Sequence, residues 1–181
     1  MSSYFPRLRE LCLQVKAFPS NFSLGSYLPT TLQLPHLQAL EITSPGSYLL
    51  DRLTAKALKS LTLYSPHDCH GTQISSSIKA AVIHGQLLHL KFADWKPPNT
   101  SSESLRAVAV FRALSEKTPQ LLTLNFSRSF VDGGTLVSTI GKITDESTDT
   151  SKRRELEELT LSYPAGITND QCEELKKLVK K

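Results

Sequence analysis

The side chains best suited to hold a metal ion lie in one short segment of the chain, at His67, Cys69 and His70. Imidazole and thiolate groups are the usual ligands of zinc. A self-contained zinc site needs a second pair of ligands at a suitable spacing, and none follows in the sequence. A surface loop is therefore the preferred interpretation, and we expect no metal.

No other pattern indicates catalysis. An acidic run at Asp145, Glu146 and Asp149 is weakly suggestive of a hard cation, but a solvated loop explains it better. The chain has no G-x-S-x-G, no phosphate-binding loop, no G-x-G-x-x-G and no H-E-x-x-H. We therefore expect a protein that is not an enzyme and that needs no cofactor.

The dominant feature of the chain is a repeated Leu-x-x-Leu-x-apolar phrase. Repetition at this period predicts a solenoid in which each unit buries its apolar side against its neighbours. The second and third apolar positions alternate along a strand and face the core, so the residues between them face outward on a shared sheet. The phrase occurs at Leu8–Leu11–Leu13, Leu37–Leu40–Ile42, Leu58–Leu61–Leu63, Leu87–Leu90–Phe92, Leu121–Leu124–Phe126 and Leu156–Leu159–Leu161.

Strands alternate with helical patterns, which predicts a parallel sheet. The strands are expected near 9–15, 39–43, 60–64, 89–93, 123–127 and 158–162. Between them, 16–33 is expected to be loop, with room for one short helical turn or for a further degenerate strand. Helical spacing is found at 49–53, 74–82, 105–114, 136–140 and 172–179, and capping boxes are expected at Thr100–Glu103 and Thr168–Gln171. The whole chain, 1–181, is predicted to be one α/β leucine-rich-repeat solenoid of about six irregular repeats, with a curved parallel sheet on one face and helices or loops on the other.

Composition points to an intracellular protein, in the cytoplasm or the nucleus. The net charge of +4 comes from 21 basic and 17 acidic residues, and four lysines near the C-terminus account for the excess. No apolar run is long enough to span a membrane, and the N-terminus does not read as a signal peptide. The cysteines Cys12, Cys69 and Cys172 are far apart and form no C-x-x-C motif.

The repeats resemble the leucine-rich-repeat region of fungal F-box proteins of the mushroom type. The segments that carry the resemblance are FPRLRELCLQV, LPHLQALEITSP, YLLDRLTAKALKSLTLYSP and ELEELTLSYPAGITNDQCEELKKLV. The resemblance implies the substrate-binding half of a ubiquitin-ligase adaptor, which reaches the ligase scaffold only if an F-box exists upstream. The chain departs from the family because its first strand is expected within ten residues of Met1, which leaves no room for an F-box. It also has Lys16, Pro45, Pro66, Trp95, Ser129 and Pro164 where the family usually has Asn or Cys.

The outward positions of the sheet are mostly small and polar. Tyr64, His89 and Lys91 form the one expected cluster with bulk and charge, and Tyr is a common anchor in interfaces. With Glu41 and Asn125 they are the residues expected to contact a protein partner on the concave sheet face. Ser and Thr on a solvated sheet are ordinary strand residues, and that is the plain alternative for this face.

The function expected from these observations is protein–protein recognition by an unknown partner. Two alternatives remain open. One is a truncated or degenerate repeat fragment without activity of its own. The other, disfavoured, is a weak nucleic-acid-binding surface, since Lys91 is the one basic residue among the outward strand positions.

Overall fold

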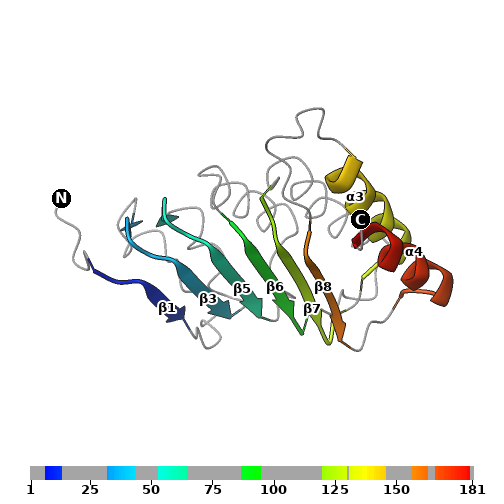
Figure 1. The fold of residues 1–181 in the computed structure, drawn as a ribbon. Helices are drawn as coiled ribbons and strands as arrows, with labels where there is room; N and C mark the ends of the chain where they lie inside the picture. Colours follow the sequence, from blue (N-terminus) through cyan, green and yellow to red (C-terminus); the bar gives the residue numbers. More distant parts are fainter. Residues whose placement is uncertain are drawn as a thin grey trace.

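Parallel strands form one continuous six-stranded sheet in the computed structural model (Figure 1). The structure describes residues 7–13, 32–43, 53–64, 87–94, 120–129, 131–145, 156–162 and 166–179. The strands follow one another across the sheet as β1 (Glu10–Leu13), β3 (Ala39–Thr43), β5 (Ser60–Tyr64), β6 (His89–Ala93), β7 (Thr123–Ser127) and β8 (Glu158–Ser162). The last five have the bounds that the sequence predicts. β1 is shorter, because Arg9 precedes it and residues 14–15 lie outside the described part of the chain.

The six strands are aligned in one register, so that equivalent positions of the phrase lie side by side. Leu40 pairs with Leu61, which pairs with Leu90, and the same line continues to β1 and β8 at its two ends. Each inward position of the central strands is almost fully buried. Phe92 and Phe126 extend the second line and stack with ring centroids 5.2 Å apart. Burial of each such leucine stabilises the fold by roughly 1.5–3 kcal/mol.

The residue just before each strand fixes the start of the next strand by accepting two backbone hydrogen bonds. The carbonyl of Arg9 accepts the N–H groups of Gln38 and Ala39, at 2.7 and 3.0 Å. The carbonyl of Lys59 in the same way accepts from Leu88 and His89. The same pair of bonds is made by the carbonyls of Gln38, Leu88 and Leu122. The sheet therefore begins along a regular edge whose backbone is held from strand to strand.

A second, short parallel sheet precedes two of these strands. β2 (Leu32–Gln33) pairs with β4 (Leu53–Thr54), and Leu34 N–H donates to Thr54 O at 2.9 Å. The expected helical face that included Leu53 is wrong at that residue, because its backbone pairs with β2 instead. The segment 16–33, expected to be loop or a degenerate strand, does contain strand at its end.

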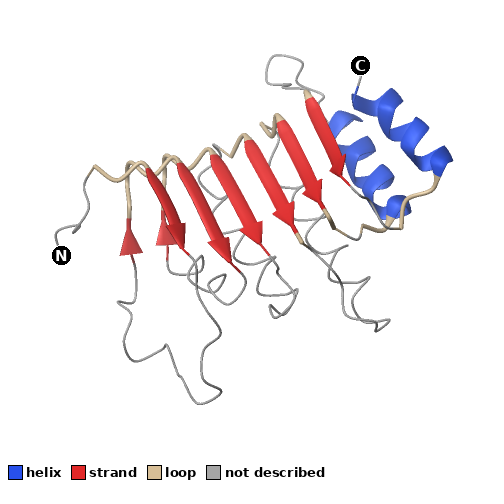
Figure 2. Cartoon of the chain, turned by 90° about the horizontal axis from the view of Figure 1, so that it is seen from below, coloured by secondary structure: helices blue, strands red, loops and turns tan. Residues whose placement is uncertain are grey.

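Two capped helices pack together beyond β8 (Figures 1 and 2). α3 (Gly133–Asp145) begins where Asp132 Oδ2 accepts a hydrogen bond from Thr135 N–H at 3.1 Å. Gly133 and Gly134 lie in the first turn of that helix. α4 (Asn169–Val179) has the predicted capping box: Thr168 N–H donates to Gln171 Oε1 at 2.9 Å, and Gln171 N–H donates to Thr168 Oγ1 at 3.3 Å.

These elements make a mixed α/β structure with a parallel sheet. α3 contributes Leu136 and Ile140 to the core, and α4 contributes Leu175. The expected helices at 74–82 and 105–114, and the expected capping box at Thr100–Glu103, lie outside the described residues. Within the described part of the chain, neither helix has the length and apolar character required to cross a bilayer.

Candidate recognition face

The sheet presents three straight rows of side chains on the side away from the core. We call these positions the outward face. They alternate with the buried leucines, and the register aligns them from strand to strand. The row at the start of the strands is Glu10, Ala39, Ser60, His89, Thr123 and Glu158; the middle row is Cys12, Glu41, Thr62, Lys91, Asn125 and Thr160; the row at the end is Thr43, Tyr64, Ala93, Ser127 and Ser162.

Glu41 is the centre of a polar group on the first three strands of the face. The Cys12 thiol and the Tyr64 hydroxyl both lie close enough to its carboxylate to be influenced by its charge. Local desolvation, then the negative charge of Glu41 and its hydrogen bond, raise the pKa of Cys12 above its ordinary value. The same causes raise the pKa of Tyr64. Glu41 itself forms no ion pair with a cation among the described residues.

Lys91 is the corresponding basic residue on β6. It shares the middle row with Glu41 and is separated from it by Thr62. Two strand spacings, about 10 Å, therefore lie between the two backbones. Lys91 has no ion-pair partner in the described part of the chain. Beside it on β7, Asn125 Oδ1 is buried and accepts no hydrogen bond from the described residues.

His89 lies at the beginning of β6 and is exposed. Its Nδ1 is 3.0 Å from Thr123 Oγ1 on the neighbouring strand. Tyr64 pairs with Ala93, at the other end of β6. His89 and Tyr64 are therefore separated by four residues along the strand direction, or about 13 Å.

The five residues predicted for partner contact thus share one face but do not form one cluster. The structure brings Lys91 next to Asn125 and Tyr64 next to Glu41. It does not bring Tyr64 together with His89. The sequence analysis did not predict that Cys12 lies beside Glu41. The signal that could have found this pair is that the two residues occupy the same position in consecutive Leu-x-x-Leu-x-apolar phrases.

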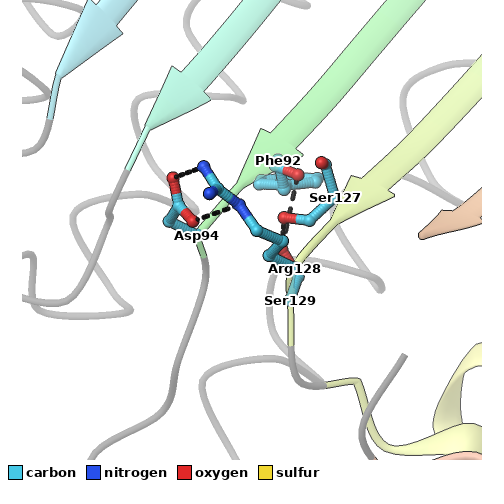
Figure 3. A network of polar contacts seen from close by, with 5 residues as sticks. All are labelled: Phe92, Asp94, Ser127, Arg128 and Ser129. Atoms are coloured by element: carbon cyan, nitrogen blue, oxygen red, sulfur yellow. Dashed lines mark hydrogen bonds and ion pairs between the residues drawn. The ribbon is translucent and has the colours of Figure 1, made fainter. Parts of the chain in front are cut away.

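A polar contact links two strands at the edge of the sheet where they end (Figure 3). Arg128, just after β7, donates to both carboxylate oxygens of Asp94, just after β6: Nη2 to Oδ2 and Nε to Oδ1 are each 2.8 Å. Both residues have a positive φ, 58° for Asp94 and 51° for Arg128. Such a backbone conformation is uncommon for residues other than glycine. The two-pronged ion pair aligns the two turns, although exposed pairs of this kind contribute little to stability.

Ser129 stands at one of the positions where the family pattern has Asn or Cys. Its hydroxyl is buried and lies within hydrogen-bonding distance of two carbonyl oxygens, that of Phe92 at 3.3 Å and that of Ser127 at 3.0 Å, which share its single proton. Figure 3 shows this side chain turned toward the end of the preceding strand. At this position, therefore, a side-chain hydroxyl joins two neighbouring strands.

No group of three His, Cys, Asp or Glu side chains among the described residues could hold a metal ion. The raised pKa of Cys12 keeps its thiol protonated, and the thiolate is the reactive form. The segment with His67, Cys69 and His70 lies outside the described residues, as do Trp95, Glu146 and Asp149.

Comparisons with known proteins add no relative. A scan against protein-family models, a search of curated proteins and a search of solved structures each found no match.

Proposed function

We propose that this protein is a leucine-rich-repeat recognition module that binds a protein partner on its outward face. The observation that carries the proposal is the middle row of that face. Glu41 and Lys91 stand in one row with opposite charges, and neither is ion-paired among the described residues. Charges that are left without an ion-pair partner among the described residues are available to complementary charges of a partner.

Protein recognition suits this arrangement better than chemistry on a small molecule. The middle row offers one carboxylate, one ammonium group and an amide, and Tyr64 adds a phenol beside them; these are groups that can orient a protein surface. A partner with a basic side chain over Glu41 and an acidic one over Lys91 would satisfy both charges.

The resemblance to fungal F-box proteins makes the proposal more specific. In such a protein the repeats would serve as the receptor for a ubiquitin-ligase substrate, with a scaffold bound through an F-box upstream. The alignment of all six phrases in one sheet supports the leucine-rich-repeat part of this reading. The adaptor role and an intracellular location stay predictions.

One observation favours the alternative of a degenerate repeat without activity. The inward residues of β1, Leu11 and Leu13, are only partly buried, and Leu32 of β2 is 38% exposed. Apolar surface at this end of the sheet would bind a hydrophobic dye such as ANS if nothing covers it. Strong dye binding together with aggregation would favour this alternative over recognition.

The proposed function is tested by affinity capture with matched variants. Wild type, a Tyr64→Ala/Lys91→Ala variant and a control variant, Thr160→Ala/Lys142→Ala, are immobilised and exposed to a lysate of a mushroom-forming fungus. Quantitative mass spectrometry then compares the retained proteins. The control also changes one outward residue and removes one exposed lysine, but Lys142 lies on α3 and Thr160 at the far side of the face.

We expect a specific protein to be retained by wild type and by the control and to be lost from the Tyr64/Lys91 variant. All preparations must first show the same melting temperature. Recovery of ligase scaffold with wild type would support the adaptor role. Retention of the same proteins by both variants, or of none by wild type, would count against recognition on this face.

A further inference from the structure

Unpaired cations gather along the edge where the first strands of the sheet begin. We call this group the basic rim; it consists of Arg7, Arg9, Lys56 and Lys59, all exposed. None of them forms an ion pair among the residues that the structure describes. Within 7–10, 34–39 and 55–60, the described residues of this edge, Glu10 is the one acidic residue. The rim is therefore positively charged, and it lies outside the rows of the outward face discussed so far.

The backbone beneath the basic rim is fixed, although its side chains form no ion pair with any described residue. The carbonyls of Arg9 and Lys59 each accept two N–H groups from the next strand. Leu58, which lies between Lys56 and Lys59, is 2% exposed. β3 is the one strand between β1 and β5, so the two ends of the rim are about 10 Å apart. Charges held at a set spacing can select a ligand by the spacing of its own charges.

The charge of this edge changes sign along the sheet. At β8 the position equivalent to Arg9 and Lys59 is Glu157, and Glu158 follows it at the position equivalent to Ser60; both glutamates are exposed. The described residues 120–123, at the start of β7, carry no charge. β8 is three strands beyond β5, or about 14 Å. A long polyanion that followed the edge, such as a nucleic-acid strand, would run from the cations into these carboxylates.

We propose that the basic rim binds a short acidic segment of the protein partner, laid across the beginnings of β1, β3 and β5. This inference rests on the proposed function, because the same partner would occupy the adjoining outward face. Alternate side chains of an extended peptide point to the same side at about 6.6 Å intervals, so two or three acidic residues cover the rim. Glu157 and Glu158 then limit the length of the acidic segment.

The experiment uses fluorescence anisotropy with defined probes. The labelled probe is a ten-residue peptide in which glutamate alternates with serine, and its control has glutamine in place of glutamate. The rim variant is Arg9→Gln/Lys59→Gln. The matched variant is Lys142→Gln/Lys177→Gln, which changes the net charge equally at exposed positions on α3 and α4.

We expect the glutamate peptide to bind wild type, with an affinity that falls as salt rises. The rim variant should bind about fivefold more weakly, and the matched variant less than twofold more weakly. The glutamine peptide should not bind. Equal loss in both variants, equal binding of the two peptides, or no binding of the glutamate peptide would overturn the inference. If a ten-nucleotide single-stranded DNA binds wild type more tightly than the glutamate peptide does, and the rim variant loses this binding, the ligand of the rim is nucleic acid and the inference of an acidic peptide is overturned.

Failure here is distinguishable from failure of the proposed function, because the two experiments change different residues. If the glutamate peptide does not bind while the Tyr64→Ala/Lys91→Ala variant loses its partner, only the rim assignment fails. If the peptide binds through the rim while that variant keeps every partner, recognition on the outward face fails and the rim stands.

Discussion

Truncation of Leu61 to alanine should be among the most costly single changes to the sheet. Leu61 is 0% exposed and lies in register between Leu40 and Leu90, which are also buried. The change removes three buried carbons, so lost transfer free energy is about 2.4 kcal/mol. The cavity left behind adds to this, which brings the expected loss to about 2–5 kcal/mol. For a chain of this size, the melting temperature should fall by about 4–20 °C.

Two control variants make the test one of the register as well as of burial. Thr62→Ala changes the next residue, which is only half-buried and faces outward; it should alter the free energy of unfolding by less than about 0.5 kcal/mol. Leu11→Ala changes the same row of the core in the partly exposed strand β1, and should cost less than about half as much as Leu61→Ala. Thermal and urea unfolding followed by circular dichroism measure all three. A loss at Thr62 equal to that at Leu61 would refute the assignment of faces.

Two further predictions concern Glu41 and the start of α3. Glu41→Gln should lower the pKa of Cys12, because the negative charge of Glu41 helps to keep the thiol protonated in the folded protein. More thiolate would then be present at pH 8, and iodoacetamide should alkylate Cys12 faster. Mass spectrometry of the Cys12 peptide measures the rate, and an unchanged rate would contradict the role of Glu41. Because the pKa of the Cys12 thiol is higher in the folded than in the unfolded protein, the protonated thiol stabilises the fold below pH 9, and this stabilisation is lost at higher pH. Gly134→Ala should stabilise the protein by about 0.5–1 kcal/mol, because a Cβ there has room. Gly133→Ala should fail to do so, because its Cβ would overlap Gln171 Oε1, the atom that caps α4. Equal melting temperatures of the two alanine variants would show that this cap is dispensable.

Periodicity predicted the strands better than any other part of the fold. A shift of one residue in any strand would turn its leucines outward, so the alternation of the phrase specifies each register strongly. This is why the bounds of β3, β5, β6, β7 and β8 agree with the sequence. The capping box of α4 was predictable for a similar reason, because Thr168 and Gln171 satisfy each other's backbone donors locally.

Short-range patterns failed where pairing with a distant segment decides the structure. Leu53 fits a helical spacing, yet it belongs to β4. The reason is that β4 pairs with β2, in which the partner of Leu53 is Leu32, 21 residues earlier in the chain. This segment is too short for its own propensity to prevail over such contacts.

The sequence by itself determined which residues of each strand point toward the core and which point to the opposite face, because a period of two allows no other arrangement around an apolar core. Only the tertiary structure decided which outward residues meet, since that depends on strand order and register. It placed Glu41 beside Cys12 and Tyr64, separated Tyr64 from His89, and joined Asp94 to Arg128 across 34 residues of chain. It also brought the cations of two distant phrases to one edge, because β1 and β5 lie on either side of β3.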